Sequence, residues 1–204
     1  MQKVLLSVAA AAALSFASFG AHAASQGAFV NASVGSSRYD TSGDDFFQDK
    51  TDTAYGIAIG YRWAVDAPFY LGVEGGYANL GKMTGRYNYG QVGMTTSLKA
   101  DTILIGGNAK WELPSSWFIT ARLGLAHSKS KLRADAYAGS ATASDSVSST
   151  DNGIYAGLGF GYDFTPNLGL AVTYDHYSMK AQHIIGTKQT VNSGVFGGTL
   201  EFRF

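Results

Sequence analysis

Large apolar residues alternate with small or polar residues along much of the chain. From residue 55 to residue 63 the odd positions carry Tyr, Ile or Trp, whereas the even positions carry Gly, Ala or Arg. The same alternation returns at 69–77, 117–125 and 154–164. Because successive side chains of a strand point to opposite faces, this period of two predicts antiparallel strands that each have one apolar face.

The alternation, together with the segments that interrupt it, predicts eight strands. They are expected near residues 26–39, 52–63, 69–80, 98–111, 116–135, 152–164, 167–180 and 190–204. Short links are expected at 64–68, 112–115 and 165–167, and long polar links at 42–52, 81–97, 139–151 and 181–189. Strict alternation of short and long links is typical of barrels in the bacterial outer membrane, whose turns are tight on the periplasmic side. Both chain ends are therefore expected in the periplasm.

The second face of the predicted strands separates a membrane barrel from a soluble one. Alternation by itself also fits a soluble sandwich or a lipocalin-like barrel. Here the non-apolar face carries mostly Gly, Ala and Thr, which suits the narrow interior of a small barrel. The apolar face ends in aromatic residues, which are expected to form a girdle at one membrane interface: Tyr61, Trp63, Phe69, Trp111, Trp117, Tyr162, Phe164, Phe202 and Phe204.

The first residues have the pattern of a secretory signal peptide. A positive charge at Lys3 precedes an apolar run from Val4 to Phe19, and Ala21 and Ala23 stand where signal peptidase requires small residues. The apolar run is shorter than the ~20 residues that a spanning helix needs. The sequence therefore predicts an all-β protein, with a cleavable signal peptide at 1–23 and an eight-stranded antiparallel up-and-down transmembrane β-barrel at 24–204.

Composition excludes several other classes of protein. Lys plus Arg and Asp plus Glu both number 15, so no basic field favours nucleic acid. The chain has no cysteine, which excludes disulfides, zinc thiolates, a cysteine nucleophile and a lipid-modified cysteine. The four histidines have no metal-ligand spacing, so neither a metal nor a cofactor is expected.

The last residues of the chain alternate in the same way. Leu200, Phe202 and Phe204 are expected to face lipid, and Glu201 and Arg203 to face the interior. A terminal aromatic residue on such a strand resembles the sorting signal of bacterial outer-membrane proteins. The resemblance implies that the barrel-assembly machinery and periplasmic chaperones handle this chain during its biogenesis.

Three stretches carry a more specific resemblance, namely 68–77, 119–124 and 162–167. They are similar to the third strand, the fifth strand and a late turn of the outer membrane protein A transmembrane domain and of its small relatives OmpX and Ail. The resemblance implies an integral protein of the Gram-negative outer membrane, in contact with lipid and lipopolysaccharide. It covers the barrel alone, and no peptidoglycan-binding domain is expected.

Charged residues with inward parity are the first candidate site. Glu74, Lys110 and Arg122 are expected inside the barrel, and the resemblance implies a cluster of paired acids and bases there. Because a buried charge is costly unless it is paired, Glu74 is expected to meet Arg122 or Lys110. Such a cluster is either a gate or a structural plug, and the narrow interior favours the plug. A complete quartet is not expected, because Gly161 and Ala171 stand where the family places further charges.

A second candidate site is His176 with Ser178, which share one strand face. The pair resembles the His-x-Ser site of lipid A deacylases, which are also small barrels. A serine nucleophile needs a base, and the base needs an orienting acid. No Asp or Glu stands between 181 and 200, and Asp175 faces the other way, so catalysis by this pair is not favoured.

The predicted loops hold the remaining candidates. Two aromatic residues follow two acids at 44–47, and 82–94 mixes basic residues with Tyr and Met. Lys129, Lys131 and Arg133 alternate above an apolar run, where they could neutralise lipopolysaccharide phosphates. The leading hypothesis is a non-enzymatic barrel that supports envelope integrity or binds a host or cell-surface ligand through its loops. The alternatives are a narrow or gated pore and a lipid A-modifying enzyme.

Overall fold

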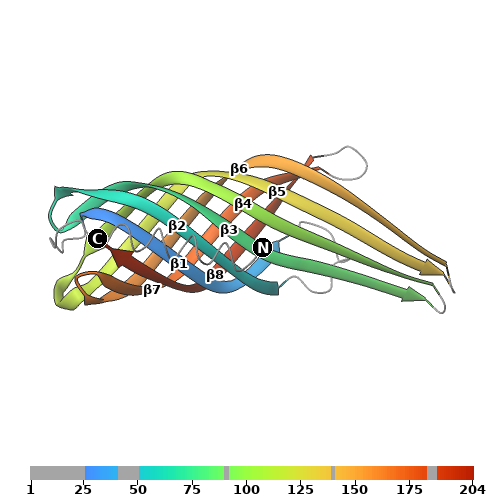
Figure 1. The fold of residues 1–204 in the computed structure, drawn as a ribbon, viewed down its shortest axis with the longest axis horizontal. Coiled ribbons are helices and arrows are strands. Elements are labelled where there is room, and N and C mark those ends of the chain that lie inside the picture. The colour runs from blue at the N-terminus through green and yellow to red at the C-terminus, as the bar shows by residue number, and fades with distance from the viewer. Residues whose placement is uncertain (1–25, 41–50, 90–91, 139–140, 183–187) are drawn as a thin grey trace.

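Eight antiparallel strands form a closed ring in the computed structural model (Figure 1). The structure describes residues 26–40, 51–89, 92–138, 141–182 and 188–204. The strands are β1 (Gly27–Asp40), β2 (Thr51–Asp66), β3 (Phe69–Tyr89), β4 (Val92–Glu112), β5 (Trp117–Ala138), β6 (Ala141–Thr165), β7 (Leu168–Gln182) and β8 (Lys188–Arg203). Each strand pairs with the next one in the sequence, and β8 closes on β1. The predicted eight-stranded up-and-down barrel is therefore confirmed.

Tight turns join the strands at one end of the barrel. β2 passes to β3 through Ala67 and Pro68, and a 3-10 turn, η1 (Pro114–Ser116), precedes β5. Between β6 and β7 the hydroxyl of Thr165 accepts the backbone N–H of Leu168 at 3.0 Å. The expected short links are thus present. Within the described ranges, no helix is long and apolar enough to cross a membrane.

At the opposite end, β3, β4, β5 and β6 continue far beyond the other four strands (Figure 1). The last β2–β3 pair is Tyr55 with Asn79, whereas β3 stays paired with β4 as far as Tyr89 and Val92. We call this four-stranded part, residues 80–89, 92–101, 129–138 and 141–153, the extension.

The extension corrects the expectation of long loops at 81–97 and 139–151. These residues are strands, and β5 pairs with β6 continuously as far as Ala138 and Ala141. The sequence predicts loops at these residues because both faces of a sheet outside the apolar part of the barrel can be polar. Such strands lack the alternation of apolar and polar residues by which a half-buried strand is recognised. The other two expected long links fall mostly on 41–50 and 183–187, outside the described residues.

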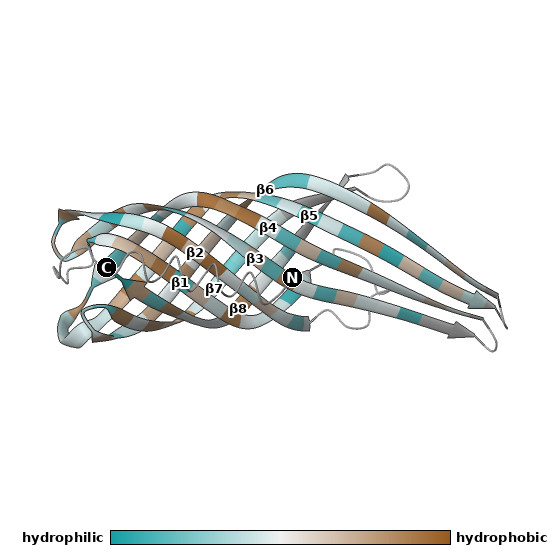
Figure 2. Cartoon of the chain, viewed as in Figure 1, coloured by the Kyte–Doolittle hydropathy of each residue, from teal (hydrophilic) through white to brown (hydrophobic). Residues whose placement is uncertain are grey.

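The outer surface of the barrel is apolar. Ile59, Leu123 and Leu158 point outward and are more than half exposed, and Figure 2 shows hydrophobic and hydrophilic segments alternating along the barrel strands. At the end with the tight turns the expected aromatic residues lie against each other. Ring pairs form between Tyr61 and Trp63, Trp117 and Tyr162, Tyr162 and Phe164, and Phe202 and Phe204.

The register of β8 agrees with the alternation predicted from the sequence. Leu200 and Phe202 are each 46% exposed on the outer surface, whereas Glu201 and Arg203 are each 4% exposed inside. The backbone N–H of Phe204 donates to Ala28 at 3.0 Å and so extends the closure of β8 on β1. The role of these residues as an assembly signal remains a prediction. The expected cleavage site at Ala21 and Ala23 lies outside the described residues.

An arginine at the middle of the outer surface tests whether this surface faces lipid. We expect Leu123→Arg to lower the free energy of unfolding by about 2–4 kcal/mol, because the bilayer midplane penalises a charge by that amount. Urea unfolding of the barrel in phospholipid vesicles measures the loss. Leu123→Ile is the control and should change little. Equal stability of the two variants would contradict a lipid-facing Leu123.

Candidate functional site

Ionised side chains fill the barrel next to the tight turns. The guanidinium of Arg62 on β2 donates two hydrogen bonds to the Glu201 carboxylate, at 2.9 and 2.8 Å. Lys110 Nζ lies 2.9 Å from Asp163 Oδ2 and 3.6 Å from Glu201 Oε1. Arg203 bridges the same two acids, at 2.8 Å from Asp163 and 3.0 Å from Glu201. We call these five residues the lower cluster.

Two aromatic rings pack against cations of the lower cluster. The guanidinium carbon of Arg62 lies 4.1 Å from the centre of the Phe29 ring, and Lys110 Nζ lies 4.1 Å from the centre of the Phe118 ring. Both cations are 2% exposed or less. Buried charges are tolerated only when they are paired and well solvated by protein groups. Here every base has an acid, and two of the bases also have a π face.

A second group of charges lies further along the barrel, away from the tight turns. Arg122 Nε on β5 donates to Asp175 Oδ1 at 2.7 Å, and Arg122 Nη1 lies 3.8 Å from Glu74 Oε1. Tyr155 donates its hydroxyl hydrogen to Glu74 at 2.8 Å, and the hydroxyl of Tyr177 accepts from Arg122 at 3.3 Å. We call these five residues the upper cluster.

The three interior charges expected from parity fall into different clusters. Glu74 and Arg122 lie in the upper cluster, in contact with each other. Lys110 lies in the lower cluster and pairs with Asp163 and Glu201 instead. All three side chains thus point inward, as expected. The sequence did not predict that they divide between two clusters at different levels of the barrel.

The expectation of an incomplete charge set was wrong. Gly161 and Ala171 are indeed uncharged, and they face each other across β6 and β7. These two strands nevertheless supply Asp163 and Asp175, which lie two and four residues further along. The alternation of inward and outward positions along β6 and β7 is sufficient to place both acids inside the barrel. Comparison with the positions that the family uses for its interior charges misses them.

Gly157 leaves the space that the Arg122–Asp175 pair occupies. A Cβ at this position would overlap Asp175 Oδ1 and lie 3.0 Å from Arg122 Cγ. A small residue on the inner face of a strand can therefore also make room for a neighbouring side chain. At Gly157 the absent side chain makes room for an ion pair that joins β5 to β7.

Apolar side chains close the barrel above the upper cluster. Tyr39, Leu80, Met83, Ala100 and Leu104 are almost fully buried in one cluster, and the hydroxyl of Tyr39 donates to the Leu80 carbonyl oxygen at 2.9 Å. This layer lies beyond the ion pairs, where the extension begins. The interior thus has two charged levels capped by an apolar one.

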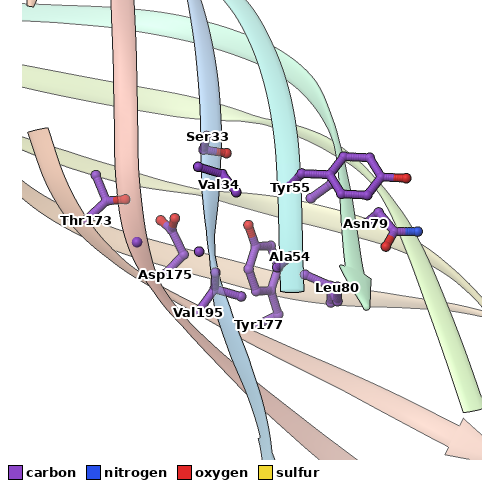
Figure 3. Close-up of a pocket in the computed structure, with 13 residues that line it drawn as sticks. Ser33, Val34, Ala54, Tyr55, Asn79, Leu80, Thr173, Asp175, Tyr177 and Val195 are labelled. Atoms are coloured by element: carbon purple, nitrogen blue, oxygen red, sulfur yellow. The ribbon is translucent and has the colours of Figure 1, made fainter. Parts of the chain in front are cut away.

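Two small cavities lie inside the barrel. One of about 40 Å³ lies between the two clusters, where Asn31 Oδ1 and Asn108 Nδ2 have no partner among the described residues. Another of about 10 Å³ lies higher, beside Asp175, Tyr177 and Val195 (Figure 3). One ordered water needs roughly 10–15 Å³ of such space, so these two cavities have room for one to a few waters each.

The charges of the two clusters balance. The bases Arg62, Lys110, Arg122 and Arg203 face the acids Glu74, Asp163, Asp175 and Glu201. The two charged levels together are thus neutral and hydrogen-bonded. The ion pairs tie together strands that are not neighbours in the ring, which is the arrangement expected of a plug.

His176 and Ser178 lie on β7 with their neighbours Ala156 and Ile154 on β6. The ring of His176 is on the exposed outer surface, and no acid contacts it within the part of the chain that the structure describes. Asp175 points inward and is bound to Arg122. Among the described residues there is also no group of three or more His, Asp or Glu that could hold a metal ion.

A closed antiparallel barrel with an apolar outside and a charged, filled inside is an integral outer-membrane β-barrel. Residues 9–204 match the family model described as the outer membrane protein beta-barrel domain, and the chain belongs to this family. Its location is the outer membrane, as the sequence predicted. No curated protein matches the chain.

Solved structures have the same fold. Neisserial surface protein A is 17% identical, with a TM-score of 0.55 over 87% of this chain and 97% of that one. The outer membrane protease OmpT from Escherichia coli is 9% identical, with a TM-score of 0.57 over 87% and 96%. Ail, the attachment invasion locus protein of Yersinia pestis, is 15% identical, with a TM-score of 0.47 over 87% and 99%. Because a protease is among them, the fold by itself does not decide the activity.

Removal of the central base of the upper cluster tests the plug. Arg122→Met leaves Asp175 and Glu74 buried without their cation, and we expect the free energy of unfolding to fall by about 3–5 kcal/mol. Urea unfolding in vesicles measures this loss. Lys129→Met removes an exposed base from the same strand and is the matched control. Equal losses in the two variants would contradict a structural role for the buried pair.

Proposed function

We propose that this protein is a non-enzymatic recognition protein, whose barrel anchors the extension at the cell surface. In this proposal both chain ends lie in the periplasm and the extension points away from the cell. The observation that carries the proposal is the unequal length of the strands. Four strands continue as a paired sheet beyond the last β2–β3 pair at Tyr55 and Asn79, which membrane anchoring alone does not require.

The extension offers backbone groups and side chains to a partner. Along β6 no strand pairs with residues 141–153 on the side away from β5, within the described part of the chain. A strand edge of this kind can accept an extended peptide from another molecule. Met94 and Tyr137 are exposed apolar residues near the far end of the extension, and Val147 is exposed in the middle of the unpaired edge of β6. These features support recognition by contact and not by chemistry.

The interior supports neither a steady pore nor an enzyme. Ion pairs and a buried apolar layer fill much of the lumen, and the two cavities described above have volumes of about 40 and 10 Å³. His176 and Ser178 have the residue types of a lipid A deacylase site, but Asp175 is engaged with Arg122. Without an orienting acid, a serine and a histidine on one outer face do not form a catalytic triad.

Shortening the extension separates recognition from anchoring. We expect a variant in which Asn-Gly replaces residues 85–96 and another Asn-Gly replaces 135–144 to fold and insert normally, because two-residue turns suit paired strands. The new turns would join Thr84 to Ser97 and Ala134 to Asp145, which are cross-strand partners. A deletion strain carrying this variant should attach to cultured epithelial cells no better than the deletion strain itself.

The wild-type gene in the same strain is the positive control for attachment. Permeability of the outer membrane to vancomycin is measured in parallel, and it should be equal in the strains with the full and the shortened protein. Full attachment by the shortened variant, or no attachment by the wild type, would contradict recognition through the extension. A permeability defect restored only by the full protein would instead favour a role in envelope integrity.

A conductance measurement tests the plug in the same context. We expect the purified barrel in planar bilayers to give no steady current, because side chains fill the interior of an eight-stranded barrel. Single-channel recording over a range of voltages is the measurement. A stable open level with the wild-type protein would support the pore instead of the plug.

A further inference from the structure

All six basic residues of the extension lie on one of its two faces. Lys82, Arg86, Lys99, Lys129, Lys131 and Arg133 are exposed, and strand pairing places them on the face that continues the outer surface of the barrel. The opposite face carries no base, and its acids are Asp145 and Asp151. The extension is therefore a sheet with one basic face.

Three of these lysines are direct neighbours across the strands. Lys82 on β3 pairs with Lys99 on β4, and Lys99 pairs with Lys131 on β5. We call these three residues the lysine row. Like charges directly opposite each other destabilise a sheet, since their Cβ atoms lie only about 4.5–5.5 Å apart. Three lysines side by side on adjacent strands therefore destabilise the sheet locally, and a bound anion would relieve their repulsion.

The acids near the lysine row are already engaged. Asp52 on β2 accepts the backbone N–H groups of Thr53 and Lys82, at 2.7 and 2.6 Å. Asp101 on β4 accepts hydrogen bonds from the hydroxyl of Tyr77 and from Asn79 Nδ2, each at 2.6 Å. Asp135 pairs with Arg133 on its own strand at 3.0 Å. No ion pair involves the lysine row within the described residues. Its charge is therefore available to an external anion.

The height of the lysine row matches the outer surface of a bilayer. The last large aliphatic residues on the outer face of β4 and β5 are Ile103 and Leu125, and Lys99 lies four residues beyond Ile103. Four residues correspond to about 13 Å along a strand, or roughly 9 Å above the apolar belt at the tilt of such strands. Lysine side chains can also bend toward the charged surface, as they do at membrane interfaces.

We propose that the lysine row is a binding site for the phosphate groups of an outer-leaflet glycolipid of the lipid A type. Strands lie about 4.8 Å apart, so neighbouring ammonium groups can converge on one phosphate or span two. The site faces the lipid side directly above the apolar belt, where a phosphate fixed in the membrane meets it. The inference rests on the orientation in the proposed function, with the extension outside the cell.

The sequence alone indicated part of this site. Lys129, Lys131 and Arg133 stand out because they alternate within one stretch. Lys82 and Lys99 lie in segments that read as loops, so their place beside Lys131 depends on the pairing of β3, β4 and β5. Only the folded sheet builds the row.

The test uses the full barrel in zwitterionic detergent micelles, with bisphosphorylated lipid A as the probe. In Lys82→Gln/Lys99→Gln/Lys131→Gln, lipid A should bind about a hundredfold more weakly, as expected when three lysines are lost beside an anionic surface. Without lipid A the same variant should unfold at a higher temperature than the wild type, since the like-charge row is gone. Adding lipid A should raise the wild-type unfolding midpoint and leave that of the variant nearly unchanged. The substitutions are therefore expected to raise the unfolding temperature in the absence of lipid A and to abolish most of its rise when lipid A is added.

Matched variants and probes separate the possible sources of the anion. The corresponding triple Lys→Arg variant should keep the affinity, and lipid A without phosphates should bind wild type as weakly as the glutamine variant binds lipid A. Equal binding of phosphorylated and dephosphorylated lipid A would overturn the proposal, as would inorganic phosphate or heparin binding as tightly as lipid A. If the triple glutamine variant does not fold, Lys99→Gln carries the same comparison with a smaller expected loss. The shortened variant keeps the lysine row. It should therefore bind lipid A whether or not shortening the extension affects attachment, so the two proposals can fail separately.

Discussion

A strand inside a lipid bilayer has no water to satisfy its backbone N–H and C=O groups, so the ring of strands must close. The pairing of β8 with β1 provides that closure, and every other feature of the barrel depends on it. A ring of eight strands is narrow. Its inner face must therefore carry either small residues or larger side chains that pack tightly against each other. Gly157 leaves the room that the ion pair of Arg122 and Asp175 requires.

The narrow interior also explains why charges occur inside it in balanced sets. An unpaired ion in this space would be costly, whereas four acids and four bases at two levels neutralise each other across the barrel. Such pairs connect strands that are not neighbours, for example β2 with β8 through Arg62 and Glu201, and β5 with β7 through Arg122 and Asp175. The interior is thus built for cohesion, which leaves recognition to the surface.

Beyond the membrane the same strands serve a different purpose. Once lipid no longer selects apolar side chains, the outer face of β3, β4 and β5 carries the bases of the extension in place of Ile, Leu and Val. The lysine row stands at this change of environment. One sheet therefore combines an apolar belt, a basic level and a polar free end in the order in which a membrane surface presents lipid chains, phosphates and water.

The sequence by itself determined the number of strands, the tight turns and the inward or outward direction of residues such as Leu200 and Glu201, because alternation is a local property of a strand. Only the tertiary structure decided which inward charges meet. Lys110 pairs with Asp163 and Glu201 because closure and strand stagger bring β4, β6 and β8 together inside. It also decided that 81–89 and 92–97 form paired strands and not a loop. There the order comes from hydrogen bonds between strands, which no pattern within one strand records.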